Sequence, residues 1–415
     1  MPIPKKNDLK DRLARYRQIK ISVVGRKSGC CAHDYAVGGL MSGVSRWASI
    51  VLLLVAFAAN GSPSSGMHRV PAIGSSINGP TALALDNNGH LFVIEEEEDR
   101  IDRIDLGDGT ISVVAGYGRK PEQDCLHRDG IQATRACLQY PTSLAIDASG
   151  NLFIGEMSGY LREVNLGTGL ISTVNESGHS GETVEGSFAL SANFWSIDGL
   201  AIDADNDLFI SDVRQGGIFK VNARTGVVTR IAGNGKQGFR GDGESALNAS
   251  FHNAVTISLD NAGNLLIADS GNCRIRRVEH STGIVRTVAV TGEVRQDGSC
   301  KAGNLELSPD PSHPAADSTG SVYFVEGAMD IVRRVDAQTF SLSTVVGTGA
   351  KGFHGDGGPA GQARLNNPSG LAVDRDGNLY ISEFVNNRVR RVDARSKVIT
   401  TIAGNGLPHR RDLMM

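Results

Sequence analysis

The stretch LAVDRDGNLYISEFVNNRVRRVD (371–393) predicts the fold of this 415-residue chain. It begins with a short apolar run, and the turn Arg375-Asp376-Gly377 separates this run from a second one. Residues 388–393 then carry two apolar side chains among polar ones, and a fourth run, VITTI (398–402), follows. Residues that accept a positive φ close tight hairpins, and short runs with apolar residues between such turns are consistent with strands. We therefore expect four antiparallel strands, here called a to d.

Five further stretches repeat this pattern upstream. They are LALDNNGHLFVIEE (83–96), LAIDASGNLFIGEM (144–157), LAIDADNDLFISDV (200–213), ISLDNAGNLLIADS (257–270) and AADSTGSVYFVEG (315–327). The aspartates that anchor the six copies are Asp86, Asp147, Asp203, Asp260, Asp317 and Asp374, which stand 61, 56, 57, 57 and 57 residues apart. Self-similarity at a steady interval indicates a repeat architecture, in which each unit buries its apolar face against its neighbours. Six copies fill residues 60–415 as one domain.

The predicted strand c carries the same pair of apolar residues in every copy. The pairs are Ile101/Ile104, Leu161/Val164, Ile218/Val221, Ile275/Val278, Val332/Val335 and Val389/Val392. The repeat region shows no amphipathic helical pattern. A four-stranded antiparallel unit that occurs six times predicts an all-β, six-bladed β-propeller, since radial closure removes the exposed sheet edges of a linear array.

Two places depart from the repeat. Pro311, His313 and Pro314 occupy strand a of the fifth unit, where proline is poorly tolerated, so we expect this strand to be degraded. The sixth unit has a complete strand d of its own, and Met67–Ile73 ahead of the first unit offers only a weak strand. Ring closure is therefore expected to rest on weak pairing of Met67–Ile73, or on none.

These residues resemble a known family. GNLYISEFVNNRVRRVD (377–393) and GNLLIADSGNCRIRRVE (263–279) are similar to NHL repeats, which form six-bladed propellers. The linkers GFRGDG (238–243) and GFHGDGG (352–358) resemble those of bacterial secreted NHL-repeat proteins. The resemblance implies the fold, whereas the activity has to be argued from a site, because this fold hosts many functions.

The N-terminal region predicts a targeting segment. Residues 47–59 (WASIVLLLVAFAA) form an apolar run too short for an ordinary transmembrane helix, with Arg46 before it and an A-x-A pattern at its end. Residues 1–46 form a basic extension that is long for a signal, and Met41 is an alternative start. The run is thus a signal peptide or an uncleaved anchor. Both interpretations predict export of residues 60–415: secreted, periplasmic or anchored to the outer side of the membrane.

The charge distribution limits the classes of partner that the protein can bind. The net charge is −3, but residues 1–46 carry ten Lys and Arg against three acids, so the remaining residues carry −10. Phosphate binding requires clustered basic residues. The sequence therefore predicts no nucleic-acid partner, and contact with a membrane only through the N-terminal segment. We expect a monomeric propeller.

Long d–a connectors predict where a ligand binds. They span 117–140, 175–196, 234–252, 293–313 and 348–367, and loops of this length are usually functional or disordered. In a propeller they share one face with the b–c turns. Side chains differ between units where these connectors enter strand a, and variation within a regular framework suits recognition. The ligand-binding candidates are Tyr140, Trp195, His252, Asn253, Asn366 and Asn367. Phe194 and Phe251, beside them, are expected to pack between blades.

An acidic residue ends strand b in every unit. These are Glu95, Glu156, Asp212, Asp269, Glu326 and Glu383. Six carboxylates at one rim could bind a cation, but we favour a structural role in which they cap the b–c turn or pair with an arginine of strand c. The Asp86 series is likewise expected to fix the a–b turns. Asp242 of Arg-Gly-Asp (240–242) belongs to a recurrent Gly-Asp-Gly turn and is expected to be structural.

The main prediction is a non-catalytic binding module that holds a protein or glycan on its long-loop face. The alternative is a metal-dependent lyase or hydrolase at the channel mouth, and a third possibility is a purely structural module. His127, His179, His252, His313 and His354 lie in connectors and could ligate zinc, as in the peptide-amidating lyases that share this architecture. The surrounding motifs do not match those enzymes, so no catalytic residue is assigned. We expect no cofactor, with zinc or calcium as the alternative.

The repeat region contains four cysteines. Cys125 and Cys137 fall in one connector, and Cys273 and Cys300 fall on the same predicted face. Export makes disulfides favourable, so the disulfide candidates are Cys125–Cys137 and Cys273–Cys300, with four free thiols as the alternative.

Overall fold

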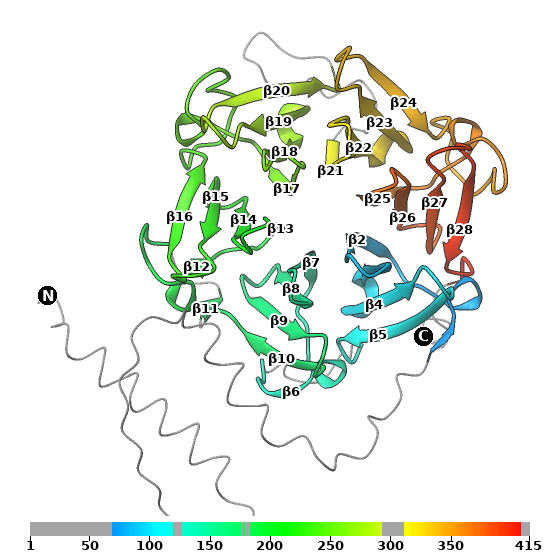
Figure 1. The fold of residues 1–415 in the computed structure, drawn as a ribbon, viewed down its shortest axis with the longest axis horizontal. Coiled ribbons are helices and arrows are strands. Elements are labelled where there is room, and N and C mark those ends of the chain that lie inside the picture. The colour runs from blue at the N-terminus through cyan, green and yellow to red at the C-terminus, as the bar shows by residue number, and fades with distance from the viewer. Residues whose placement is uncertain (1–68, 119–126, 176, 179–182, 293–310, 408–415) are drawn as a thin grey trace, which may run out of the picture. The chain divides into compact units, whose positions relative to one another are not determined.

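The computed structural model describes residues 69–118, 127–175, 177–178, 183–292 and 311–407 (Figure 1). The predicted extension and targeting segment (1–59) lie outside these residues. In the part of the chain that the structure describes, no helix is long and apolar enough to cross a membrane.

The repeat region forms six antiparallel sheets, each with the chain order a-b-c-d. Blades 1 to 3 comprise β2(Pro80–Leu85), β3(His90–Glu95), β4(Arg100–Asp105) and β5(Thr110–Ala115); β7(Pro141–Ile146), β8(Asn151–Glu156), β9(Leu161–Asn165) and β10(Leu170–Thr173); and β13(Gly199–Ile202), β14(Leu208–Asp212), β15(Gly217–Val221) and β16(Val228–Ala232). Blades 4 to 6 comprise β17(Ala254–Leu259), β18(Leu265–Asp269), β19(Arg274–Val278) and β20(Val285–Val290); β21(Pro311–Ala316), β22(Val322–Glu326), β23(Ile331–Val335) and β24(Leu342–Val346); and β25(Pro368–Val373), β26(Leu379–Glu383), β27(Arg388–Val392) and β28(Ile399–Ala403).

The blades surround a central axis, with strand a innermost and strand d outermost (Figure 1). Each strand a contacts the strand a of the next blade, and β25 contacts β2, so the ring is closed. The prediction of an all-β, six-bladed propeller is therefore confirmed.

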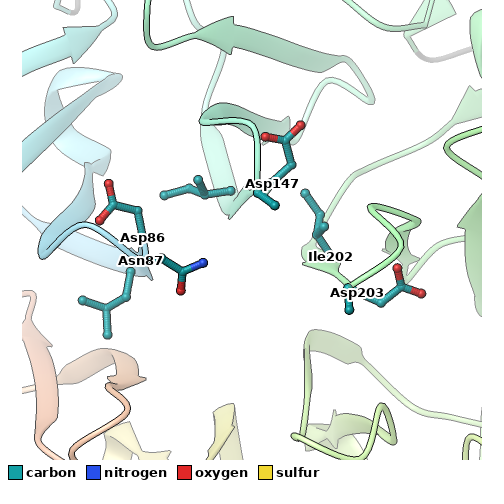
Figure 2. Close-up of a pocket in the computed structure, with 9 residues that line it drawn as sticks. Asp86, Asn87, Asp147, Ile202 and Asp203 are labelled. Atoms are coloured by element: carbon teal, nitrogen blue, oxygen red, sulfur yellow. The ribbon is translucent and has the colours of Figure 1, made fainter. Parts of the chain in front are cut away.

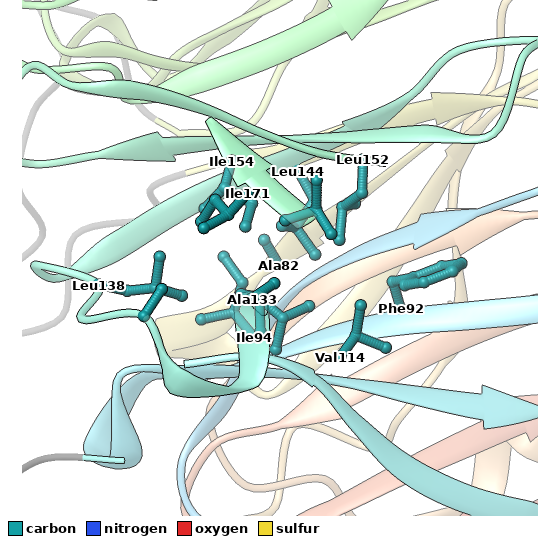
Figure 3. Close-up of a cluster of buried hydrophobic side chains, with 14 residues drawn as sticks. Ala82, Phe92, Ile94, Val114, Ala133, Leu138, Leu144, Leu152, Ile154 and Ile171 are labelled. Atoms are coloured by element: carbon teal, nitrogen blue, oxygen red, sulfur yellow. The ribbon is translucent and has the colours of Figure 1, made fainter. Parts of the chain in front are cut away.

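Apolar side chains between adjacent blades make up the core. Figure 3 shows Phe92 and Ile94 of blade 1 facing the side chains of Leu144, Leu152 and Ile154 of blade 2. Phe92 and Ile154 are fully buried, which stabilises the fold by about 1.5–3 kcal/mol for each side chain. Phe194 and Phe251 are buried as well, so their predicted packing is confirmed.

The connectors join neighbouring blades in a recurring way. Before blade 2, β6(Ile131–Gln132) pairs with the outer strand β10, and the 3-10 helix η4(Ala133–Arg135) follows. The Gly116 N–H, at the end of blade 1, donates to the Ala133 carbonyl at 3.0 Å. Corresponding bonds run from Gly233 to Ala246 (2.9 Å) and from Gly347 to Ala360 (3.0 Å). A connector therefore extends one blade at its edge and binds the preceding blade.

The ring is closed by the same combination of an added edge strand and a hydrogen bond to the preceding blade. β1(Val70–Pro71) pairs with β5, η2(Ala72–Gly74) follows, and the Gly404 N–H donates to the Ala72 carbonyl at 3.0 Å. Gly404 has a φ of +90°, and a Cβ there would lie 2.2 Å from the Asn387 carbonyl oxygen, so only glycine fits this junction. The weak strand expected in Met67–Ile73 is therefore a two-residue pairing, reinforced by a junction that the other connectors share.

The expectation for the fifth blade was wrong, because β21(Pro311–Ala316) pairs with β22 along an irregular register. The irregularity lies between Ser312 and Ala315, at a bulge that contains Pro314. Strand a has a neighbour on one side only, and proline is tolerated at edges and bulges because its missing N–H breaks no ladder there.

Candidate binding face

The chain connections divide between two faces of the propeller. On what we call the loop face, the b–c turns meet the d–a connectors: the Met157 N–H donates to the Tyr140 carbonyl (3.0 Å), and the Phe384 N–H donates to that of Asn367 (3.1 Å). On what we call the turn face, the a–b and c–d turns meet, as shown by the 2.9 Å bond from the Leu106 N–H to the Gly89 carbonyl.

The anchoring aspartates stand at the turn-face end of strand a, and their carboxylates are occupied by the turn. In blade 6, Asp374 Oδ1 accepts from the N–H groups of Asp376 (3.0 Å) and Asn378 (2.8 Å), and Oδ2 accepts from Asn378 Nδ2 (2.7 Å). The paired main-chain bonds recur at Asp86, Asp147, Asp203, Asp260 and Asp317. The prediction that these residues fix the a–b turns is confirmed.

A shallow hollow of about 250 Å³ opens at the turn face between blades 1, 2 and 3. Figure 2 shows the side chain of Asn87 reaching toward it, while the carboxylates of Asp86, Asp147 and Asp203 turn outward into their own turns. Since these carboxylates accept the turn N–H groups, the hollow offers a ligand little beyond Asn87 and apolar side chains.

The acidic residues that end strand b are all buried at the loop-face end, and most bind the connector that enters their own blade. Asp269 Oδ1 accepts from the His252 N–H at 2.7 Å, and Asp212 Oδ2 accepts from the Trp195 N–H at 2.8 Å. Glu383 Oε2 accepts from the Asn366 N–H at 3.0 Å, while its Oε1 accepts from Arg390 Nη1 at 3.3 Å. Four of the carboxylates thus hold connector main chain in place, those of Glu95, Asp212, Asp269 and Glu383. Glu156 and Glu326 contact side chains instead, and a structural role fits both patterns.

Burial sets the electrostatics of these carboxylates. It raises the pKa of Asp269 to about 6, even though Asn272, the His252 N–H and Arg276 all act to lower it. Burial, and after it the charge of Asp102, raises the pKa of Glu95 well above the ordinary value of a glutamate. Desolvation disfavours the charged form of a carboxylate, so keeping these buried groups ionised costs free energy.

The six ligand-binding candidates lie at equivalent positions on the loop face. Trp195, His252 and Asn366 are the residues whose N–H groups bind the acid that ends strand b. Tyr140, Asn253 and Asn367 precede strand a in their blades and are exposed, whereas His252 and Asn366 are half-buried. The main chain is fixed here by hydrogen bonds that any residue type could make, which leaves the side chains able to differ from blade to blade.

The backbone before strand a has a left-handed conformation in several blades. The φ angles are +57° at Gly79, +51° at Asn253 and +51° at Asn367, and these residue types tolerate that region. Tyr140 has the same conformation, with a φ of +50°, although its side chain is bulky and 56% exposed. An aromatic residue in a strained position, with most of its surface in solvent, is not what the fold alone would select.

The b–c turns contribute side chains that the sequence analysis missed. Met157 is 52% exposed, Met329 42% and Val385 53%. Together with Tyr140 and the 37% exposed Trp195, they form what we call the apolar ring of the loop face. Met157, Met329 and Val385 each follow the acid that ends strand b by one to three residues, where a turn would ordinarily carry polar residues. That contrast could have identified them.

Tyr140, Met157 and Trp195 belong to one continuous part of this ring. The Met157 N–H binds the Tyr140 carbonyl, and the neighbouring Glu156 carbonyl accepts from the Ile197 N–H at 3.2 Å. The b–c turn of blade 2 therefore lies between the segments that carry Tyr140 and Trp195.

The histidines proposed as zinc ligands are dispersed. His127 Nε2 lies 2.9 Å from Glu156 Oε2, and its ring stacks on Tyr160 with centroids 4.0 Å apart. His313 lies in β21 and His252 at the start of blade 4, while His179 lies outside the described residues. Within the described part of the chain, no three His, Cys, Asp or Glu side chains gather in a way that could hold a metal ion.

The Gly-Asp-Gly turns bind buried arginines of strand c. Asp242 lies 2.8 Å from Arg276 Nη2, and Asp356 lies 2.7 Å from Arg390 Nη2; both arginines are fully buried. This confirms that Asp242 of the Arg-Gly-Asp tripeptide is a structural residue.

The proposed disulfides are described only in part. Cys137 and Cys273 are each disulfide-bonded, whereas Cys125 and Cys300 lie outside the described residues. The pairing itself stays a prediction.

Comparison with protein-family models gives two matches. Residues 58–165 match the teneurin NHL domain, and residues 365–392 match the NHL repeat. Among curated proteins, the chain is 25% identical over 333 residues to Protein SUPPRESSOR OF QUENCHING 1, chloroplastic, from Arabidopsis thaliana, covering 77% of this chain and 30% of that protein. It is 35% identical over 94 residues to human Teneurin-4, covering 21% of this chain and 3% of that protein. The chain thus spans less than a third of the length of these relatives.

Solved structures share the architecture at low identity. A protein of unknown function from Bacteroides thetaiotaomicron gives a TM-score of 0.53 at 14% identity, with 79% of this chain and 72% of that chain covered. An auxiliary nutrient binding protein from the same organism gives 0.51 at 15% identity, with 79% and 70% covered. At such identities the likeness establishes the fold alone.

Proposed function

Because the chain is an NHL-repeat β-propeller, we propose that it is a non-catalytic binding module that holds a protein or glycan partner on its loop face. The observation that carries the proposal is the apolar ring, whose five side chains are 37–56% exposed around one face of the propeller. Exposed apolar patches of this kind mark interaction sites, and Tyr and Trp are the usual anchors of such sites.

The chemistry of the loop face favours binding over catalysis. An enzyme needs titratable groups that converge in a concave site. Here the acids that end strand b are buried, and Asp212, Asp269 and Glu383 accept main-chain N–H groups of the connectors. They support the loop face without being presented to a ligand. A binder requires only exposed anchors on a rigid base, and the ring combines the two.

The proposal includes export, with residues 47–59 as the targeting segment and with disulfides Cys125–Cys137 and Cys273–Cys300. Fractionation of cells that express the full chain should place it outside the cytoplasm, and replacing Leu52–Leu54 with charged residues should retain it inside. In the exported protein, alkylation without reductant should label none of these four cysteines. A cytoplasmic chain or four reactive thiols would contradict this part.

Binding is tested by presenting the purified full chain to a glycan array and to a displayed library of random heptapeptides. Ligands of the wild type should lose at least tenfold in affinity on Trp195→Ala and on Met157→Ser, with thermal stability nearly unchanged. Phe340→Gly is the matched control, because Phe340 is 74% exposed but lies in a c–d turn on the turn face. Ligands that survive both loop-face changes, or the absence of any ligand, would overturn the proposal.

A further inference from the structure

The apolar ring is interrupted by charge at one blade. The b–c turn of blade 1 is the 3-10 helix η3(Glu96–Glu98), in which Glu96 and Glu97 are exposed and Glu98 is buried. The corresponding turns of blades 2 to 6, all of which the structure describes, expose no carboxylate: Asp330 in blade 5 is buried. The negative charge that the b–c turns present to solvent is therefore concentrated at blade 1.

The position of Glu97 places this charge inside the ring rather than beside it. A Cβ on Gly79 would lie 2.9 Å from Glu97 Cγ and equally close to the ring of Phe384, so Glu97 stands at the junction of blades 6 and 1. Val385, the residue after Phe384, is an exposed member of the ring. Blade 2, with Tyr140 and Met157, lies on the other side of blade 1, since β2 contacts both β25 and β7.

The net charge of the rest of the chain also favours a cationic partner. Residues 47–415 carry a net charge of −10, which attracts cationic partners and accelerates their encounter with this surface. The exposed cation on the b–c turns is Arg214 in blade 3, two blades away from Glu97. Among the b–c turns, this positive charge therefore lies away from Glu97.

The composition of the ring distinguishes between classes of partner. A sugar is recognised by flat aromatic faces together with hydrogen bonds, and Met157, Met329 and Val385 supply neither. Methionine is flexible and adapts to apolar side chains of varied shape, which suits a polypeptide surface. Two exposed carboxylates next to apolar side chains match a Lys or Arg that projects from an apolar segment.

Resting on the proposed function, we infer that the partner of the loop face is a basic peptide segment, in which a Lys or Arg faces Glu96 and Glu97 while flanking apolar residues contact the apolar ring. Tyr140 and Met157 lie on one side of the acidic turn and Val385 on the other, so an extended segment with apolar residues on both sides of its cation fits this arrangement.

The test uses the full chain and the displayed heptapeptide library. The selected peptides should be enriched in Lys or Arg next to Leu, Ile, Phe or Trp, and the best of them, synthesised and labelled, should bind more weakly as salt rises. The double variant Glu96→Gln, Glu97→Gln should weaken this peptide roughly five- to tenfold, in line with exposed charge pairs. Arg214→Gln, a matched loss of charge on the same face, should bind it at least as well as the wild type.

The outcomes separate the two proposals. Neutral or acidic peptides that require Trp195 and Met157 would overturn the basic-peptide inference and leave the binding module intact, as would basic peptides that ignore the double variant. If only glycans bound, and their binding depended on Trp195, the basic-peptide inference would also be overturned and the binding module would stand. No ligand dependent on the ring, in either format, would overturn both.

Discussion

The chain is held in place differently at the two ends of strand a. At the turn-face end, an aspartate side chain builds the turn, and that residue is the same in all six blades. At the loop-face end, a buried acid of strand b binds the main chain of the connector, as Glu383 does with the Asn366 N–H. The residue bound in this way varies: it is Trp195 in blade 3, His252 in blade 4 and Asn366 in blade 6. Where the main chain makes the contact, the side chain becomes available for recognition.

The largest effect should come from removing an acid that holds a connector. Glu383→Ala leaves the fully buried Arg390 without one of its two carboxylate partners and the Asn366 N–H without its acceptor. Breaking a buried pair in this way costs about 3–5 kcal/mol, which thermal or denaturant unfolding would detect. Asn366→Ala is the control and should stay within about 0.5 kcal/mol. If the two variants lost equal stability, the side chain of Asn366 would matter as much as the acid that binds its main chain, which would contradict this account.

A pH series should show the cost of burying these acids. Burial raises the pKa of Asp269 to about 6 from an ordinary value of 3.8, so the folded state binds the proton more tightly than the unfolded state does. Its contribution to stability is present below about pH 4 and is lost as the pH rises to about 6, by up to about 3 kcal/mol. The free energy of unfolding of Asp269→Asn, measured at intervals from pH 4 to 6.5, should fall less steeply than that of the wild type. Parallel curves would refute this account.

Removing a turn-face aspartate should lower the stability less than removing Glu383, because the turn that the aspartate holds is partly hydrated. Asp374→Ala removes the acceptor of the Asp376 and Asn378 N–H groups, and we expect a loss of about 2 kcal/mol in thermal unfolding. Asp147→Ala should lose a similar amount, since its turn has the same bonds. Asp376→Ala, at an exposed position in the same turn as Asp374, is the control and should be nearly neutral.

The smallest effect should have the opposite sign. Tyr140→Asn relieves a bulky residue at a φ of +50° and should stabilise the protein by up to about 1 kcal/mol while weakening ligand binding. Phe340→Gly relieves similar strain at a φ of +56° on the turn face, and it should stabilise the protein without affecting binding. If Tyr140→Asn destabilised the protein, Tyr140 would belong to the structural framework rather than to the recognition surface.

Much of this architecture could be predicted from the sequence, because its cues are local. Asp374, Gly377 and the apolar runs around them predict a hairpin within a dozen residues, and the repetition of that hairpin predicts six blades. The buried positions of Phe194 and Phe251 followed from the same repetition. The fifth blade was mispredicted, because Pro311 and Pro314 were judged as interior strand residues when they lie at an edge and a bulge.

The candidate site could be predicted only in part. The connector residues Tyr140 and Trp195 stood out because they vary within a repeat, and the structure places them on one face. Met157, Met329 and Val385 were missed. Their apolar character in a turn is visible in the sequence, but which residues of other blades lie beside them depends on how the blades pack. The acids that end strand b were correctly interpreted as structural. Their partners were expected in the b–c turn or among the arginines of strand c, yet Asp269 also binds the connector N–H of His252, 17 residues earlier in the chain.

The sequence by itself determined the repeat, the strand order within each blade and the turns closed by aspartate, since these depend on contacts between residues close together in the chain. The tertiary structure alone decided how the ring closes, which acids are buried and which side chains surround the loop-face mouth. The Gly404–Ala72 junction joins the last blade to the segment before the first, and the apolar ring gathers residues from four blades. Such contacts depend on the packing of blades around an axis, and chain-distant residues meet only once that packing is complete.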